Sequence, residues 1–265
     1  MTAGGRIGVP FQGCIISVLI CGSVGLVGLG PLFCQSDVLS QSERKARGIL
    51  KKTVEALGGQ AYLATRNITM EGKVFQFRRD SLRGSGKFLL FEEHPLKRRL
   101  ELNKGKIVLI NNGDQGWKIE YKNITDQTPE EIRNFRIKMK HSLGHILRLR
   151  RGEKDMKFRY LGKSRFHIIN VEGVKLIDAE GDEIKIYVNS RTSLPVKMEF
   201  ESPPRGKRWA SEDERLFHNY HVVGGVKIPF TIILNSNGYK FSEMQLTSAV
   251  INSNLSESLF SSPQK

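Results

Sequence analysis

The acidic residues around Gly181 are the side chains whose spacing comes nearest to that of a binding site. Four carboxylates surround this glycine: Asp178, Glu180, Asp182 and Glu183. Carboxylates gathered at a glycine turn are typical of calcium loops, but the ligand spacing of an EF-hand is absent. The segment is therefore better interpreted as a solvated hairpin between two strands.

Two other groups could in principle do chemistry. His218 and His221 have the spacing of a metal-binding pair, but an offset of three residues in a strand points two side chains to opposite faces. The run Glu92-Glu93-His94 ends a strand just before a proline and has no catalytic partner in sequence. The motifs HExxH, Walker A, GxGxxG and GxSxG are absent. The sequence therefore predicts a protein that is not an enzyme and has no metal or cofactor.

The charge balance points to anionic partners. The chain has 42 Lys and Arg against 27 Asp and Glu, a net charge of +15. This surplus excludes an acidic solvating protein and suits lipid head groups, nucleic acid or acidic proteins. Because net charge is the sole argument for nucleic acid, we do not expect a nucleic-acid partner. The arginines of the run 148–151 are candidates for an anionic membrane surface: Arg148, Arg150 and Arg151.

The N-terminal segment differs from the rest of the chain. Residues 1–36 contain one basic residue, Arg6, and no acidic residue, and residues 11–33 are apolar and uncharged. All three cysteines lie in this segment. The pattern predicts a secretory signal peptide or, alternatively, a retained membrane anchor, with lipidation at Cys34 less favoured. We expect residues 37–265 to form a single exported, monomeric domain in the periplasm.

Two helices are expected in that domain. The first spans 40–57, where Ser40 and Glu43 have capping-box spacing and Gly58 follows the last apolar residue. The second spans 128–151 and begins with Thr128 and a proline at the first helical position. It combines an apolar stripe with seven basic residues, so it is predicted to be an amphipathic helix.

The remaining segments alternate between apolar and charged residues, as in Trp117–Tyr121 and Val196–Phe200. Period-two alternation indicates strands with one face buried and one face in water. Short turns separate about eleven such runs, which favours an antiparallel sheet. The predicted fold class is α+β: a strongly curved antiparallel sheet, an open half-barrel, with helices against its concave face.

Four stretches resemble a known family. They are ARGILKKTVEALGGQAYL (46–63), VKLIDAEGDEIKIYVNSRTSLPVKMEF (174–200), GGVKIPFTI (224–232) and GYKFSEMQLTSAVINSNLSESLFSSP (238–263). They resemble bacterial outer-membrane lipoprotein-sorting proteins, which have the periplasmic LolA-like lipoprotein-carrier fold. The resemblance covers most of the predicted domain and implies a half-barrel whose hollow holds acyl chains. No functional residue of that family can be matched to a particular position here.

The resemblance and the strand pattern together predict an apolar cavity for a lipid-like ligand. The candidate cavity residues are apolar side chains of the strands and the second helix: Leu100, Trp117, Ile119, Tyr121, Phe135, Met139, Leu143, Phe158, Ile186, Met198, Phe200 and Phe230. The expected function is binding of lipid or lipoprotein acyl chains, as a carrier in sorting to the outer membrane. The alternative is an envelope scaffold or interaction protein with the same fold and no cargo.

Overall fold

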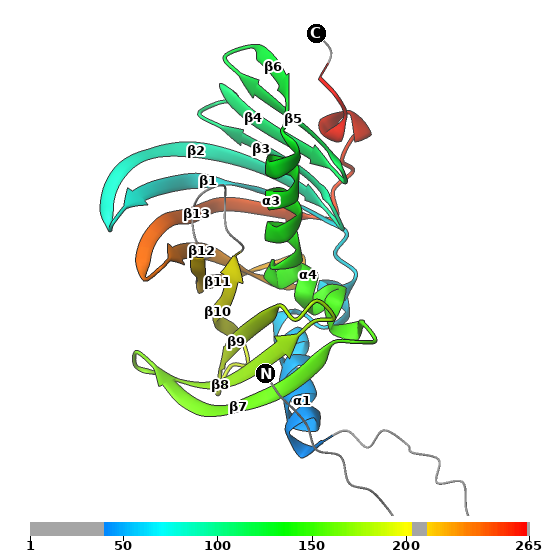
Figure 1. Ribbon diagram of the computed structural model, residues 1–265, viewed down its shortest axis with the longest axis vertical. Helices are drawn as coiled ribbons and strands as arrows, with labels where there is room; N and C mark the ends of the chain where they lie inside the picture. Colours follow the sequence, from blue (N-terminus) through cyan, green and yellow to red (C-terminus); the bar gives the residue numbers. More distant parts are fainter. Residues whose placement is uncertain (1–39, 203–210, 264–265) are drawn as a thin grey trace, which may run out of the picture. The chain divides into compact units, whose positions relative to one another are not determined.

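The computed structural model describes residues 40–202 and 211–263, all within one compact unit, Leu39–Lys265. Thirteen strands form one antiparallel sheet, which curves strongly (Figure 1). The strands are β1 Asn67–Arg78, β2 Ser81–Glu93, β3 Lys97–Leu102, β4 Ile107–Asn112, β5 Gln115–Glu120, β6 Asn123–Asp126, β7 Lys157–Phe166, β8 Ile169–Ile177, β9 Glu183–Asn189, β10 Pro195–Ser202, β11 Ser211–Val223, β12 Val226–Ser236 and β13 Tyr239–Ile251. The curved antiparallel sheet is confirmed, but thirteen strands replace the expected eleven. The predicted signal or anchor segment, 1–36, lies outside the described residues.

The order of the strands explains how the chain crosses the sheet. The order is β6-β5-β4-β3-β2-β1-β13-β12-β11-β10-β9-β8-β7, so the first and last strands are neighbours at its centre. Strands β6 and β7 follow each other in sequence but form opposite edges of the sheet. The segment between them must therefore cross from edge to edge. It contains α3 (Pro129–Lys140), α4 (Leu143–Arg148) and the 3-10 turn η1 (Arg150–Gly152).

Helix α1 (Gln41–Leu57) has the ends that its sequence predicts. The Ser40 hydroxyl accepts a hydrogen bond from the Glu43 N–H at 3.1 Å, which satisfies one free donor of the first turn. Gly58 follows with φ 132°, and a Cβ there would approach the Gly225 carbonyl oxygen to 2.6 Å. A side chain at this position would clash with the neighbouring backbone, so the residue that ends the helix has to be glycine. The short helix α2 (Gln60–Leu63) follows directly.

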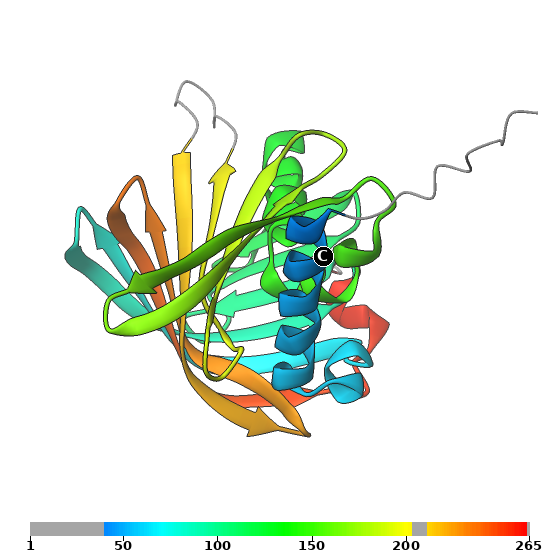
Figure 2. The same cartoon turned by 90° about the horizontal axis from the view of Figure 1, so that it is seen from below.

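Helices α1 and α4 pack against one face of the sheet. We call this face the core face. Ile49 and Leu50 of α1 and Leu147 of α4 belong to the same buried cluster as Ile186 and Met198 of the sheet. Helix α1 packs on β7, β8 and β12, and Figure 2 shows it within the curve of the sheet. Among the described residues no helix is both long enough and apolar enough to cross a membrane.

The segment predicted as one helix over 128–151 is broken. Helix α3 ends at Lys140, and α4 begins only at Leu143. The Ser142 hydroxyl accepts a hydrogen bond from the His145 N–H at 3.2 Å, so Ser142 caps a new helix in the middle of the run. The predicted N-terminus of this segment is confirmed, because Thr128 and Glu131 form a reciprocal capping box at the start of α3.

Candidate functional site

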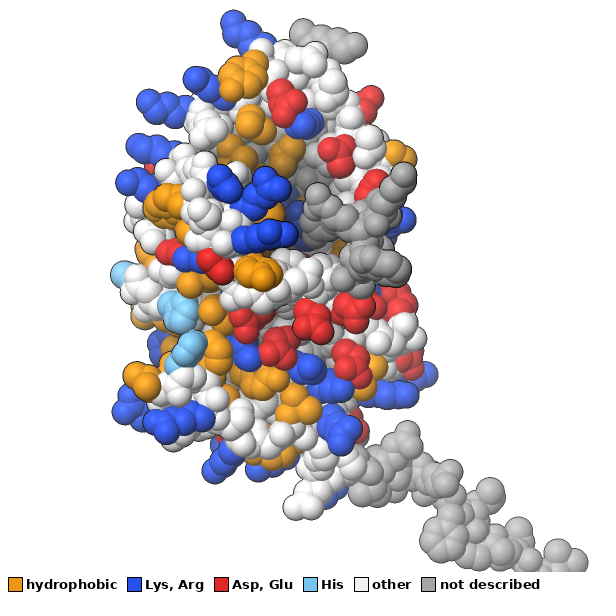
Figure 3. Space-filling model, turned by 60° about the vertical axis from the view of Figure 1, so that its left-hand side comes forward, with side chains coloured by type: hydrophobic (Ala, Val, Ile, Leu, Met, Phe, Trp, Pro, Cys, Tyr) orange, Lys and Arg blue, Asp and Glu red, His pale blue; other side chains and the backbone are white. Residues whose placement is uncertain are grey.

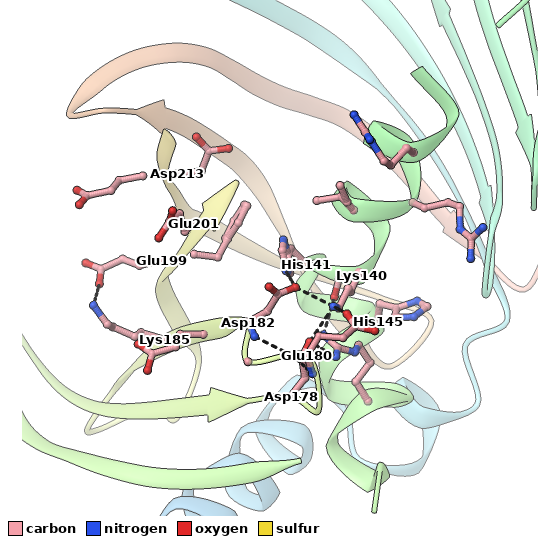
Figure 4. Close-up of a pocket in the computed structure, with 18 of the residues that line it drawn as sticks. Lys140, His141, His145, Asp178, Glu180, Asp182, Lys185, Glu199, Glu201 and Asp213 are labelled. Carbon is pink, nitrogen blue, oxygen red and sulfur yellow. Dashed lines mark hydrogen bonds and ion pairs between the residues drawn. The ribbon is translucent and has the colours of Figure 1, made fainter. Parts of the chain in front are cut away.

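A large cleft lies beside α3 and has a volume of about 1660 Å³. Residues of α3, the turn between β8 and β9, and strands β9 to β12 line it (Figure 4). Leu96, Ile132, Ile137 and Phe200 give it apolar surface. Among the described lining residues, eleven are acidic and five are Lys or Arg. Figure 3 shows a band of acidic side chains on this side of the molecule. The cleft is therefore amphiphilic rather than purely apolar.

Lys140 at the end of α3 occupies the centre of the acidic turn. Its Nζ lies 2.9 Å from Asp178 Oδ2 and 2.7 Å from Asp182 Oδ2, and it also bonds Glu180. Arg150 Nη2 adds a second cation 2.8 Å from Asp178 Oδ2. The three carboxylates converge as metal ligands would, but the Lys140 ammonium already lies among them and contacts all three. The predicted hairpin is confirmed, because 178–182 joins the antiparallel strands β8 and β9, and 179–183 are exposed. The buried Asp178 gives this turn a second role, which is to anchor the end of α3.

Asp178 is the buried centre of this anchor. Its Oδ1 accepts the N–H groups of Glu180 at 3.0 Å and Asp182 at 2.9 Å, which fixes the turn. Burial alone raises the pKa of Asp178, but hydrogen bonds from Lys140 and Arg150 outweigh it and hold the pKa well below its usual value. The same bonds outweigh burial at Lys140 and raise its pKa. The carboxylate is thus ionised throughout the physiological range.

His141 sits at the inner end of the cleft with 1% of its surface exposed. Its ring lies 4.9 Å from the Phe200 ring, and neither ring nitrogen has a hydrogen-bond partner among the described residues. Burial lowers the pKa of His141 to about 4, although Asp182 opposes this. Below the ring, the Arg215 guanidinium stacks on Phe200 and donates to the His141 carbonyl at 2.9 Å. The imidazole is therefore neutral at pH 7 and held in a rigid setting.

Two carboxylates of the strand wall, Asp213 and Glu214, accept hydrogen bonds from neutral donors. Asp213 of β11 accepts hydrogen bonds from the hydroxyls of Ser202, Ser211 and Ser236, at 2.7, 3.0 and 2.8 Å. Its neighbour Glu214 accepts a hydrogen bond from the amide of Asn235. These contacts bridge β10, β11 and β12. They arise from strand register, which the sequence alone does not give.

The twelve predicted cavity residues separate into several groups. Phe200 alone of them lines the cleft. Six others belong to the core on the core face or pack against it: Leu100, Leu143, Phe158, Ile186, Met198 and Phe230. Phe135 and Met139 are buried side chains of α3, and its neighbours Ile132 and Ile137 line the cleft instead. The predicted apolar stripe is thus mostly packed inside the protein.

Three of the twelve are placed differently from the prediction. Trp117 pairs with Ile110 and Ile119 pairs with Val108 in the ladder of β4 and β5. Arg99, also paired with Ile110, contacts the carbonyl of Leu259 beside the C-terminal turn η2 (Glu257–Phe260). Directly paired residues point to the same face of a sheet, so Trp117 shares a face with Arg99, and Ile119, two residues further along, lies on that face too. This face is covered by the C-terminal segment and is opposite to the core face. The alternation was correct, but periodicity does not say which face is buried by the core.

Tyr121 does not line a cavity. It lies in the turn after β5 with φ 48°, and 75% of its surface is exposed. Strand β5 ends one residue earlier, at Glu120, because Tyr121 and Lys122 both adopt the left-handed conformation of a tight turn. The predicted strand was one residue too long.

The three arginines expected at a membrane surface do not form one. Arg150 is 4% exposed and bound to Asp178 and Glu153, so its charge is neutralised inside the protein. Arg148 is half-buried beside His94 and stacks on Tyr62. Arg151 is partly buried and donates from Nε to the Leu147 carbonyl at 2.8 Å. The prediction failed because a basic run in a broken helix turns its side chains in different directions.

Comparison with known proteins identifies the fold. No protein-family model matches the sequence, and a comparison with curated proteins gives no match. Several solved structures are similar, among them the following three. A DUF1329 family protein from Desulfovibrio piger has a TM-score of 0.58 at 8% identity, covering 84% of this chain and 98% of its own. A LolA superfamily protein from Nitrosomonas europaea has a TM-score of 0.52 at 11% identity, with 82% and 97% covered.

A putative outer membrane lipoprotein-sorting protein domain from Vibrio parahaemolyticus is similar to the same extent. Its TM-score is 0.53 at 13% identity, and the match covers 81% of this chain and 97% of that domain. At such low identity the likeness concerns architecture, which is the curved antiparallel sheet described above. The chain has a LolA-like fold.

Proposed function

We propose that the chain is an exported periplasmic carrier that binds a lipid-like or lipoprotein acyl ligand in the cleft beside α3. The observation that carries this proposal is the mixed lining of the cleft. Ile132, Ile137 and Phe200 offer apolar surface next to many charged side chains, and an amphiphile has both kinds of surface. The volume, about 1660 Å³, exceeds the roughly 300–1,000 Å³ typical of small-ligand pockets.

The fold supports the same class of ligand. The similar domain from Vibrio parahaemolyticus is described as a putative outer membrane lipoprotein-sorting domain. In this chain the core face of the sheet is already filled by α1 and α4, whose side chains are buried there. The ligand would therefore lie between α3 and β10, not under α1. Each methylene removed from water would contribute about 0.8 kcal/mol to binding.

The charge of the cleft suggests which head group it accepts. Acidic side chains outnumber basic ones among the lining residues described. A free carboxylate head would be repelled by this wall, whereas a neutral or cationic head would not. We therefore expect an acyl probe with an uncharged head to bind more tightly than a fatty acid of equal chain length.

A fluorescence titration tests the proposal. A fluorescent acyl probe with an uncharged head should bind the wild-type domain, and Ile137→Asp should weaken binding at least tenfold because it places a charge against the acyl chain. Asn134→Asp is the matched control: it adds the same charge to α3 at a residue that does not line the cleft. Ile137→Leu should bind as the wild type does.

The alternative is an envelope scaffold with no cargo. It would gain support if the folded wild-type domain bound neither acyl probe, and the carrier proposal would then be abandoned. Export through residues 1–36 remains a separate prediction. Expressed with its own N-terminus in a Gram-negative host, the domain should be digested by protease added to spheroplasts, and full protection would contradict export.

A further inference from the structure

Two hairpin tips lie together at one rim of the sheet. The tip of β1 and β2 turns at Arg79 and Asp80, and the tip of β12 and β13 turns at Asn237. Asp80 Oδ1 accepts the Lys240 N–H at 2.7 Å, which joins the two turns. The Lys240 ammonium lies 4.4 Å from the centre of the Phe77 ring, a second link between the hairpins. The two tips thus form a single surface (Figure 1).

This surface exposes large apolar side chains. Leu82 is 57% exposed, Tyr239 is 51% exposed and Phe241 is 59% exposed. They lie near the strand ends beside the turns, and none of them is among the residues that line the cleft beside α3. Apolar groups exposed together on a soluble domain commonly mark an interaction site. We refer to these residues, with the bases described next, as the hairpin-tip surface.

The same surface is strongly basic. Five exposed bases lie on the first hairpin: Lys73, Arg78, Arg79, Arg83 and Lys87. Asp80 is the one acidic residue between them, and its carboxylate bonds a backbone N–H. Lys73 and Lys87 are direct cross-strand partners, and like charges in that position oppose strand pairing. Figure 3 shows basic side chains beside exposed apolar ones on this side of the molecule.

We propose that the hairpin-tip surface docks on an anionic lipid bilayer. Basic side chains are attracted by anionic head groups, while Leu, Phe and Tyr side chains favour the interface between head groups and acyl chains. A lipid surface fits these residues better than an acidic protein partner, because the apolar groups project from turns instead of forming a shaped groove. The docking surface adjoins the cleft at the turn of Gly238, but docking does not depend on an acyl ligand.

Vesicle flotation tests the docking surface. The probe is vesicles of phosphatidylcholine mixed with phosphatidylglycerol, compared with vesicles of phosphatidylcholine alone. The triple variant Arg78→Gln, Arg79→Gln and Arg83→Gln should partition onto the anionic vesicles roughly 100-fold more weakly at low salt, from the loss of three surface charges. A matched control replaces three exposed lysines elsewhere with Gln: Lys51, Lys52 and Lys154.

A second pair of variants separates insertion from simple charge attraction. Leu82→Ser and Phe241→Ser together should weaken partitioning about tenfold at low and at high salt, because apolar contacts are not screened. Docking at the tips is overturned if the arginine triple variant and its lysine control lose the same amount, or if folded wild-type protein does not prefer anionic vesicles. The arginine variant should still bind the acyl probe as wild type does. If the folded wild-type protein bound anionic vesicles but no acyl probe, the carrier proposal would fail and the docking proposal would stand.

Discussion

Helices α1 and α3 are the two longest helices of the described chain, and they are held in different ways. Helix α1 buries six side chains, among them Leu50 and Leu57 at 2% exposure, in the core beneath it. Helix α3 buries only Phe135 and Met139, and its end is fastened by the ion pairs of Lys140. The stabilisation of α1 therefore depends on the apolar area that it buries, whereas the stabilisation of the α3 end depends on charge and on pH.

This difference assigns separate tasks to the two helices. A helix seated in the core supports the sheet and cannot move without exposing apolar surface. A helix with its outer residues along a cleft, anchored by charge at one end, can adjust its position at lower cost. Helix α1 therefore supports the sheet, and α3 forms a wall of the proposed ligand site.

The largest expected effect is on α1. Leu50→Ala should lower the free energy of unfolding by about 3 kcal/mol, because it removes a fully buried side chain and leaves a cavity. Urea denaturation measures the change. Lys51→Ala, at the exposed neighbouring position, should change stability by less than about 0.5 kcal/mol. Equal effects from both variants would show that α1 is not seated in the core.

A smaller effect is expected at the anchor of α3. Asp178→Asn should lower the free energy of unfolding by about 2 kcal/mol at pH 7, because it removes charge-assisted bonds from Lys140 and Arg150. Leu50→Ala, by contrast, should cost the same at every pH at which the protein folds.

The pH dependence distinguishes the two effects. The pKa of Asp178 is lower in the folded state than in the unfolded chain, whose carboxyl titrates near 3.9. The stabilisation is therefore complete above about pH 5 and is lost as the pH falls through 4 toward the folded pKa. The difference between wild type and Asp178→Asn should shrink across that range. A difference that stayed constant down to pH 3 would contradict the ion-pair anchor.

The smallest effect concerns the caps. Thr128→Ala should cost about 1 kcal/mol because it removes the capping box of α3. Hydrogen exchange should show that the loss of amide protection is confined to the first turn of α3. Ser40→Ala is the parallel change in α1, where fraying should be limited because the helix is held by its buried face. Fraying that spread further in α1 than in α3 would reverse the comparison.

Local signals predicted the helix starts well. Ser40 and Thr128 cap the two helices as their sequences indicate. Ser142 was a readable signal for the break in 128–151, because serine favours caps over helix interiors. The anchor of α3 could not be predicted, since Lys140 and Asp178 meet only through a crossing from one sheet edge to the other.

The site residues were hard to predict from the sequence for the same reason, namely that they depend on contacts between distant segments. Alternation identified Phe200 and Met198 as inward-facing but placed Trp117 on the wrong face, because period two does not distinguish the two sides of a sheet covered on both. The mixed lining of the cleft comes from α3, the turn before β9 and strands β9 to β12 together. No single segment of the sequence contains that combination.

Photo-crosslinking distinguishes most directly whether α3 or α1 borders the ligand. An acyl probe with an uncharged head and a diazirine on its chain would be bound, irradiated and mapped by peptide mass spectrometry. We expect labels in α3, Pro129–Lys140, and in β10 near Phe200, and we expect Ile137→Asp to lose them. Labels confined to α1, Gln41–Leu57, would contradict this expectation and place the ligand under the helix that we assign to the core.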